Sequence, residues 1–321
     1  MSKPLPSIPV NQIPIVASSD DNYAAPLDIM FISLLENTSA PERIHFFVID
    51  GGITENRKTL LQKDVEERKS RVTFLNVNDN IYANFPTRAH ISAPAYYRIS
   101  IPELFSETVN RVIYLDCDLI IKQDIQNLWD IDTKNHPIAA VENVSSSTYK
   151  ASKLKQSDYF NSGVMIINLI EWRKGNIPKK VREFKLNHPE LICTNDQCAL
   201  NGVFKGDWFR LPLYWNHQSG LYRKSPQVER LIYKESSEDA LWDPAIIHYI
   251  GWSKPWIEPC YHPLEGEYRR YKKLSSYATV TIKDKNTEST HKRFFFSLLK
   301  KRLRQYLWQW RYKKRGIELF Q

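Results

Sequence analysis

Glycine is scarce in this sequence, with only 10 in 321 residues. No stretch matches the glycine-rich loops G-x-G-x-x-G or G-x-x-x-x-G-K-[ST], which cradle phosphates in dinucleotide-binding oxidoreductases and P-loop NTPases. The G-x-S-x-G nucleophile elbow and the H-E-x-x-H zinc motif are also missing. The sequence therefore disfavours these four classes of enzyme.

Cysteine and long apolar runs are also in short supply. The four cysteines form no C-x-x-C pair and no cluster with the spacing of zinc ligands, so we interpret them as free thiols. No run of about 18 apolar residues occurs, and residues 1–9 have no apolar stretch of the kind found in a secretory signal. These features lead us to expect a protein that works in the reducing cytoplasm.

The excess of positive charge lies at one end of the chain. The formal net charge is +9, from 45 Lys and Arg against 36 Asp and Glu. Ten of the basic residues and no acid fall between Lys292 and Arg315, which leaves 35 basic and 36 acidic residues elsewhere. A nearly neutral body argues against nucleic-acid binding, and the basic tail indicates a partner of its own.

Short apolar runs alternate with helical patterns through the first half of the chain. Residues 12–18, 44–50, 72–77 and 111–116 have the composition of buried strands, while residues 24–36 and 54–69 have helical periodicity. This alternation predicts an α/β fold with a mostly parallel central sheet, covered on both faces. Ligands of such sheets bind beyond the carboxyl ends of the strands, so the site is expected there.

The strongest candidate is the pair Asp116 and Asp118, directly after the strand at residues 111–116. Alternate residues of a strand face the same side, so the two carboxylates should converge. They would repel each other unless a divalent cation lay between them, and hard carboxylate oxygens suit Mn²⁺ or Mg²⁺. A pair of aspartates in a solvated turn or at a helix cap is an equally good interpretation of this motif alone.

A second candidate is the run H-Y-I-G-W-S-K-P-W at residues 248–256. His248 ends an apolar run, Gly251 would let the backbone approach a phosphate, and Lys254 would place a charge on it. Taken alone, His248 is more readily explained as a core histidine. Its combination with the two distant aspartates favours a metal ligand.

Two further groups of polar residues have weaker signals. Asp20 and Tyr23 follow the first strand, where a carboxylate and an aromatic face can hold a base or a ribose, although Asp20 also suits a helix cap. Asn161, Asp196 and Gln197 offer amides and a carboxylate that can hold sugar hydroxyls. For Asp196 a capping role is about equally plausible.

Six ordered runs resemble glycosyltransferase family eight, the retaining α-glycosyltransferases, and most nearly its bacterial lipopolysaccharide or lipooligosaccharide α-galactosyltransferases. Together they extend over residues 13–259. The runs are V-A-S-S-D-D-N-Y-A (16–24), H-I-S-A-P-A-Y-Y-R (90–98), V-I-Y-L-D-C-D (112–118), F-N-S-G-V-M-I-I-N-L (160–169), N-D-Q-C-A-L-N-G-V-F-K-G (195–206) and H-Y-I-G-W-S-K-P-W (248–256).

The resemblance implies a nucleotide-sugar-binding, Rossmann-like domain of the GT-A type and an Mn²⁺-dependent transfer of a hexose from a UDP-sugar. It also implies a role for each matching residue. Asp116, Asp118 and His248 would bind Mn²⁺ (or Mg²⁺), Asp20 and Tyr23 the uracil, Gly251 and Lys254 the diphosphate, and Arg98, Asn161, Asp196 and Gln197 the hexose, with His90 near the nucleotide.

The identity of the sugar and the mechanism stay open at this stage. The family commonly has an acid after the strand that corresponds to residues 138–141, where this chain has Glu142 and Asn143. Galactose is the favoured hexose and glucose the alternative. Gln197 matches the family's residue beneath the sugar and is a poor nucleophile, which favours a same-face reaction, with Asp196 as the rival nucleophile. A catalytically silent sugar-binding or membrane protein of this fold is the alternative from another class.

The basic tail has an amphipathic helical pattern. Phe295, Leu299, Leu303, Tyr306 and Trp310 recur at helical spacing among Lys and Arg, as in helices that lie on an anionic membrane. We expect a catalytic domain over residues 1–265, a linker over 266–290 and a membrane-associating tail over 291–321. The acceptor would be a glycan or glycolipid at the inner face of the cytoplasmic membrane. A tail helix packed on its own body is the alternative.

Overall fold

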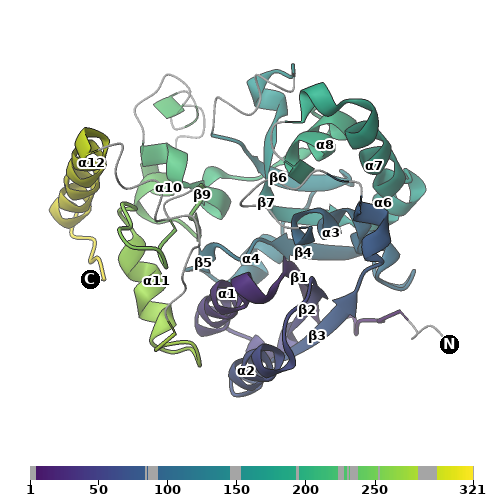
Figure 1. Ribbon diagram of the computed structural model, residues 1–321, viewed down its shortest axis with the longest axis horizontal. Coiled ribbons are helices and arrows are strands. Elements are labelled where there is room, and N and C mark those ends of the chain that lie inside the picture. The colour runs from purple at the N-terminus through teal and green to yellow at the C-terminus, as the bar shows by residue number, and fades with distance from the viewer. Residues whose placement is uncertain are drawn as a thin grey trace.

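A central mixed sheet of seven strands organises the molecule, a computed structural model in which residues 5–83, 85, 93–144, 153–192, 195–222, 228–229, 231, 238–251, 254–280 and 295–320 are described (Figure 1). The strand order is β3-β2-β1-β4-β7-β6-β8. Its strands are β1 (Ile13–Ser19), β2 (Ile44–Asp50), β3 (Arg71–Asn76), β4 (Arg111–Leu115), β6 (Ile138–Glu142), β7 (Phe160–Asn168) and β8 (Phe209–Arg210).

Most neighbours in this sheet are parallel, as predicted. β7 is the exception, because it runs antiparallel to both β4 and β6. The four strands predicted in the first half of the chain are confirmed to within one residue at each end.

Helices cover both faces of the sheet, which explains why its strands are apolar on both sides. In β2, Phe46 and Val48 face one core cluster while Phe47 and Ile49 face the other. The helices are α1 (Ala24–Glu36), α2 (Glu55–Glu66), α3 (Pro94–Tyr97), α4 (Ile125–Trp129), α6 (Leu169–Lys174), α7 (Ile177–Asn187), α8 (Asn195–Phe204), α10 (Glu238–Trp242), α11 (Glu265–Lys272) and α12 (Phe295–Lys314).

A second, three-stranded sheet lies beside the first and is decisive for the site. It has the order β5-β10-β9, with β5 (Leu119–Ile121), β9 (His217–Gln218) and β10 (Ile246–His248). β10 pairs antiparallel with β5, with His248 opposite Leu119. Since β5 begins directly after Asp118, this register brings His248 to the two aspartates.

The C-terminal part of the chain packs on the body in a third core cluster. Helix α11 lies in the region expected as a linker and buries Tyr268 and Tyr271, which are three residues apart and share one helix face. Helix α12, which lies at the far side of the molecule from the N-terminus, buries Tyr312 in the same cluster (Figure 1). Among the described residues, no helix is both long and apolar enough to span a bilayer.

Candidate functional site

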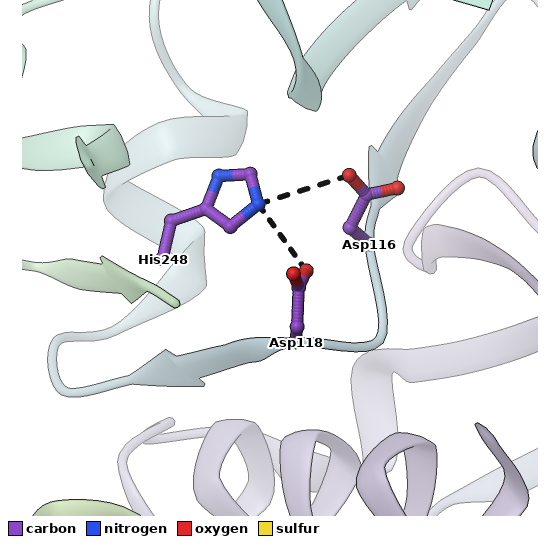
Figure 2. Close-up of side chains that lie close together, drawn as sticks. All are labelled: Asp116, Asp118 and His248. Atoms are coloured by element: carbon purple, nitrogen blue, oxygen red, sulfur yellow. Dashed lines mark ion pairs between the residues drawn. The ribbon is translucent and has the colours of Figure 1, made fainter. Parts of the chain in front are cut away.

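Asp116, Asp118 and His248 point toward one another at the carboxyl end of β4 (Figure 2). One ligand atom from each lies within 4.8 Å of the others, which is the convergence expected of a metal-binding group. His248 Nε2 is 3.2 Å from Asp118 Oδ1 and 3.8 Å from Asp116 Oδ2. The predicted convergence of these three residues is confirmed.

Backbone hydrogen bonds fix the two aspartates relative to the neighbouring strands. Asp116 N donates to Gly163 O on β7 at 2.9 Å, and Tyr249 N donates to Asp118 O at 3.0 Å. Asp116 is thereby attached to β7, and Asp118 to the residue that directly follows β10.

The residue types and the space between them fit a divalent cation. A Cβ added to Gly163 would overlap Cε1 of His248 and lie 2.7 Å from Asp116 Oδ2, so glycine is required for the three ligands to meet. Two hard carboxylate oxygens and one imidazole nitrogen suit Mn²⁺ or Mg²⁺, the latter less well because of the nitrogen. Sequence reasoning missed Gly163, although it stands in the conspicuous run F-N-S-G.

Charged neighbours compensate the two carboxylates. Burial raises the pKa of Asp116, and Asp118 adds to the rise while Arg98 opposes it. Burial alone would also raise the pKa of Asp118, but Lys254 and His248 hold it well below its ordinary value. Lys254 Nζ lies directly against Asp118 Oδ2 and donates to Tyr249 O at 2.8 Å.

Arg98 connects Asp116 to the predicted sugar side of the site. Its guanidinium lies 2.8 Å from Asp116 Oδ1 and 3.2 Å from Asp196 Oδ2, and donates to Ser162 O at 2.9 Å. Burial alone would lower the pKa of Arg98, but Asp116 and Asp196 raise it above its ordinary value. Arg98 is therefore a fixed cation between two anionic groups, a contact that its position in the sequence did not reveal.

A chain of hydrogen bonds runs from His248 to Gln197. His248 Nδ1 lies 2.9 Å from Asn216 Oδ1, Asn216 Nδ2 donates to Asn161 Oδ1 at 2.8 Å, and Asn161 Nδ2 donates to Gln197 Oε1 at 3.1 Å. Since Oδ1 of Asn216 can only accept, Nδ1 of His248 carries the proton. In the neutral ring, Nε2 then presents its lone pair toward Asp116 and Asp118, the arrangement that a metal ligand needs.

Asp196 and Gln197, the two candidate catalytic residues, are both buried and engaged. Ser162 Oγ donates to Asp196 Oδ2 at 2.9 Å, in addition to the contact with Arg98. Gln197 Oε1 accepts from Ser162 N as well as from Asn161, each at 3.1 Å. The polar residues predicted in this part of the chain therefore form one network with the metal-ligand group.

Asp20 and Tyr23, the residues predicted to hold the uracil, follow β1 at the same edge of the sheet as the two aspartates, because β1 and β4 are parallel neighbours. Asp20 Oδ1 accepts from Tyr23 N at 3.1 Å, so Asp20 caps the short 3-10 helix Asp21–Tyr23 that leads into α1. The N-cap of α1 itself is Tyr23, whose side chain makes no capping hydrogen bond. Tyr23 contacts Trp256 edge-to-face at 5.8 Å between ring centroids. Gly251 has φ of +87°, a conformation that favours glycine. His90 lies outside the described residues.

Residues whose roles the sequence did not reveal complete the site. Asn216 comes from a 3-10 helix, Leu213–Asn216, just before β9, where no motif marks it. Tyr114 OH donates to Asp116 Oδ1 at 3.1 Å, and the ring lies 4.3 Å from the Arg98 guanidinium carbon. Tyr114 sits two residues before Asp116 on the same strand face, a spacing that could have identified it.

Comparisons with known proteins agree with this arrangement. Residues 14–260 match the model of the family described as Glycosyl transferase family 8, and the chain belongs to that family. General stress protein A of Bacillus subtilis is 37% identical over 272 residues, 83% of this chain and 95% of that protein. The lipopolysaccharide 1,2-glucosyltransferase of Escherichia coli K12 is 26% identical over 259 residues, 78% of this chain and 74% of that protein.

Solved structures show the same fold. The galactosyltransferase LgtC, in complex with donor and acceptor sugar analogues, aligns with a TM-score of 0.72 and 26% identity. The alignment covers 82% of this chain and 96% of LgtC. The fold is thus of the GT-A type seen in LgtC.

Proposed function

We propose that this protein is a retaining hexosyltransferase that uses a UDP-sugar donor and a manganese ion. The observation that carries the proposal is the convergence of Asp116, Asp118 and His248 at the carboxyl end of β4. When bound there, the ion would act as a Lewis acid on the diphosphate of the donor. Magnesium is the alternative ion.

In this proposal, two cations of the site, Lys254 and Arg98, would each contact a different part of the donor. Lys254, beside Asp118, would stabilise the negative charge that develops on the departing UDP. Arg98, already paired with Asp116 and Asp196, would orient the hexose beside that leaving group. Asp20 and Tyr23 would hold the uracil, with Gly251 at the diphosphate and His90 near the nucleotide.

On the sugar side, the contacts favour a reaction on one face of the hexose over a covalent intermediate. Gln197 Oε1 already accepts two hydrogen bonds and is a weak nucleophile, so it would stabilise positive charge on the sugar by its dipole. The oxygen Oδ2 of Asp196 is held by Arg98 and Ser162, which reduces its nucleophilic character. In the same-face reaction the departing phosphate oxygen accepts the proton of the acceptor hydroxyl, and Asp196 stays the rival nucleophile.

Asp118→Asn tests the metal role. Loss of a residue that only orients a metal ligand lowers metal affinity or activity by about 10–100-fold. Loss of a ligand itself should therefore lower turnover of the UDP-hexose by at least about 100-fold. The readout is UDP release at saturating Mn²⁺, with the exposed Asp243→Asn as the matched control. Turnover by Asp118→Asn at the rate of the Asp243→Asn protein would contradict the proposal.

The donor sugar is galactose in the favoured version and glucose in the alternative. The fold similarity to the galactosyltransferase LgtC supports galactose, while the similarity to an E. coli lipopolysaccharide glucosyltransferase supports glucose. Comparing UDP release from UDP-galactose and UDP-glucose decides between them. Release from neither, with or without Mn²⁺, would instead support the catalytically silent sugar-binding protein.

The acceptor in this proposal is a lipopolysaccharide- or lipooligosaccharide-type glycan, reached from the inner face of the cytoplasmic membrane. Helix α12 supports this, since five apolar side chains on one side of it are half exposed or more: Leu299, Leu303, Tyr306, Leu307 and Trp310. Exposed Lys and Arg flank them, as in helices that lie on anionic membranes. Residues 291–321 would be the membrane-associating tail, although α12 also packs on the catalytic body.

Point substitutions test the membrane attachment better than truncation, because truncation would also uncover the body beneath α12. Leu303→Ser with Trp310→Ser should weaken binding to vesicles that contain phosphatidylglycerol by about tenfold or more, since two apolar anchors are lost. Co-sedimentation measures this, and UDP release with a soluble acceptor confirms an intact site. Undiminished sedimentation would contradict the attachment through this face.

A further inference from the structure

A cavity of about 220 Å³ lies between α11 and α12, in a part of the molecule separate from the proposed donor site. Its walls include Arg269 on α11, Arg302, Tyr306 and Lys313 on α12, and Phe320 near the C-terminus. A water molecule occupies about 30 Å³, so the cavity has room for a group of several heavy atoms.

The cavity is closed on one side by the C-terminal residues. A Cβ on Gly266 would overlap the carbonyl oxygen of Phe320, so the chain end lies directly on α11 at this glycine. The Arg270 guanidinium carbon lies 4.4 Å from the centre of the Phe320 ring, a cation–π contact that holds the ring on α11. Three separate segments therefore build the cavity.

Positive charge dominates the walls. Arg269 lies 2.9 Å from Glu258 and 3.7 Å from Glu265, which also lines the cavity. In the part of the chain that the structure describes, no ion pair involves Arg302 or Lys313. With three cations and one carboxylate among the lining residues, the cavity is complementary to an anion.

On α12, the cavity lies beside the exposed apolar side chains. At 3.6 residues per turn, the five apolar residues from Leu299 to Trp310 occupy an arc of roughly 100°. Arg302 and Lys313 lie on one side of that arc, while Lys300 and Arg304 lie on the other. Tyr306 belongs to the arc and also lines the cavity. With the arc in the acyl region, the cavity opens at the level of the lipid headgroups.

We propose that this cavity binds the phosphate of an anionic membrane lipid. This inference rests on the membrane attachment proposed above. It adds that the attached protein binds a lipid phosphate in the cavity. Arginine forks match phosphate oxygens in pairs, and lysine adds a point charge. Because the three cations approach from two helices, a phosphate, with oxygens in several directions, fits better than a planar carboxylate.

The test compares two vesicle types of equal zeta potential, one containing phosphatidylglycerol and one containing oleate, whose charge is a carboxylate. The full-length protein should bind the phosphatidylglycerol vesicles about tenfold more tightly, and Arg302→Gln with Lys313→Gln should abolish that preference. The matched control, Lys300→Gln with Arg304→Gln, removes the same charges from the other side of the arc. It should weaken binding to both vesicle types in parallel and keep the preference.

A variant outside α12 separates the cavity from general attraction to the membrane. Arg269→Gln should also reduce the preference for phosphatidylglycerol, whereas the nearby exposed Lys273→Gln should not. Thermal unfolding and UDP release with a soluble acceptor show that each variant is folded. Competition by inorganic phosphate at low millimolar concentration would overturn the lipid as the source of the phosphate.

The outcomes distinguish the two proposals. If the wild-type protein binds both vesicle types equally, or if cavity and control variants lose the same preference, the cavity proposal is overturned and membrane attachment stands. If the wild-type protein binds neither vesicle type, the attachment is overturned and the cavity proposal falls with it.

Discussion

At the scale of single residues, the site depends on side chains outside the group of three proposed metal ligands. Asn216 accepts the Nδ1 proton of His248 at 2.9 Å and thereby turns Nε2 toward the two aspartates. The same amide donates to Asn161, which in turn contacts Gln197. We therefore expect Asn216 to fix both the ring orientation of His248 and the positions of the Asn161 and Gln197 side chains.

Asn216→Ala should weaken Mn²⁺ binding by about 10–100-fold, because it removes the hydrogen bond that orients a metal ligand. Manganese titration by electron paramagnetic resonance measures the free ion directly. Asn216→Asp is the informative partner, since it keeps an oxygen acceptor for Nδ1 of His248 and loses the donor to Asn161. Equal Mn²⁺ affinity in Asn216→Ala and the wild type would contradict this role.

Gly163→Ala should lower UDP release by about 100-fold, since displacing reacting groups by about 1 Å has effects of that size. The added methyl would overlap the imidazole of His248 and crowd Asp116. Circular dichroism and urea unfolding check that the strand β7 is intact. Full activity in this variant would mean that the added methyl displaces neither His248 nor Asp116, which would contradict the close contacts of Gly163.

At the scale of elements, strands were easier to predict from the sequence than the contacts between them. The strand β2 is buried on both faces, so it appears in the sequence as the mostly apolar run at residues 44–50, interrupted by His45 and ending at Asp50. The apolar run that ends at His248 was equally visible. Its pairing with β5 was not, because a three-residue strand has no pattern that specifies its neighbour.

The same limit applies to α12. Its apolar residues at helical spacing were predicted, and four of them, Leu299, Leu303, Tyr306 and Trp310, are exposed. The opposite side of the helix, where Gln305, Trp308 and Tyr312 follow one another at i, i+3 and i+7, is held by hydrogen bonds to the body. Because both sides have helical spacing, the sequence did not reveal which of them packs on the body.

Substitution of two aromatic residues on α12 should therefore change the free energy of unfolding by very different amounts. Tyr312 is 1% exposed, and Tyr312→Ala should lower the free energy of unfolding by about 3–5 kcal/mol, as for other buried aromatics. Trp310 is 57% exposed, and Trp310→Ala should change it by about 0.5 kcal/mol or less. Urea unfolding measures both. Similar values for the two would mean that α12 does not dock on the body in solution.

At the scale of the whole molecule, four of the described histidines are buried: His45, His217, His248 and His262. Three of them, His45, His217 and His262, lie outside the proposed metal-ligand group. Burial lowers the pKa of His45 from 6.5 to about 4, with Arg71 adding to the effect, and lowers the pKa of His217 to about 3. Burial also holds the pKa of His262 well below its ordinary value. Protonation of any of these three histidines is therefore less favourable in the folded protein than in the unfolded chain.

The stability of the protein should therefore fall between pH 7 and pH 5. In this range these three histidines, with pKa values near 6.5 in the unfolded chain, bind more protons there than in the folded protein, so their contribution to the free energy of unfolding decreases as the pH falls. Asp28, whose pKa is raised by burial, opposes part of this effect. For His45 alone the loss at pH 5 is about 2 kcal/mol. His45→Asn, which can keep a hydrogen bond to Thr73, removes this contribution and should flatten the pH dependence by that amount. Urea unfolding at pH 7, 6 and 5 measures the difference between the two proteins. Parallel curves would mean that His45 is protonated at pH 5 in the folded state, and its burial between β1 and β3 would then cost far less than its surroundings indicate.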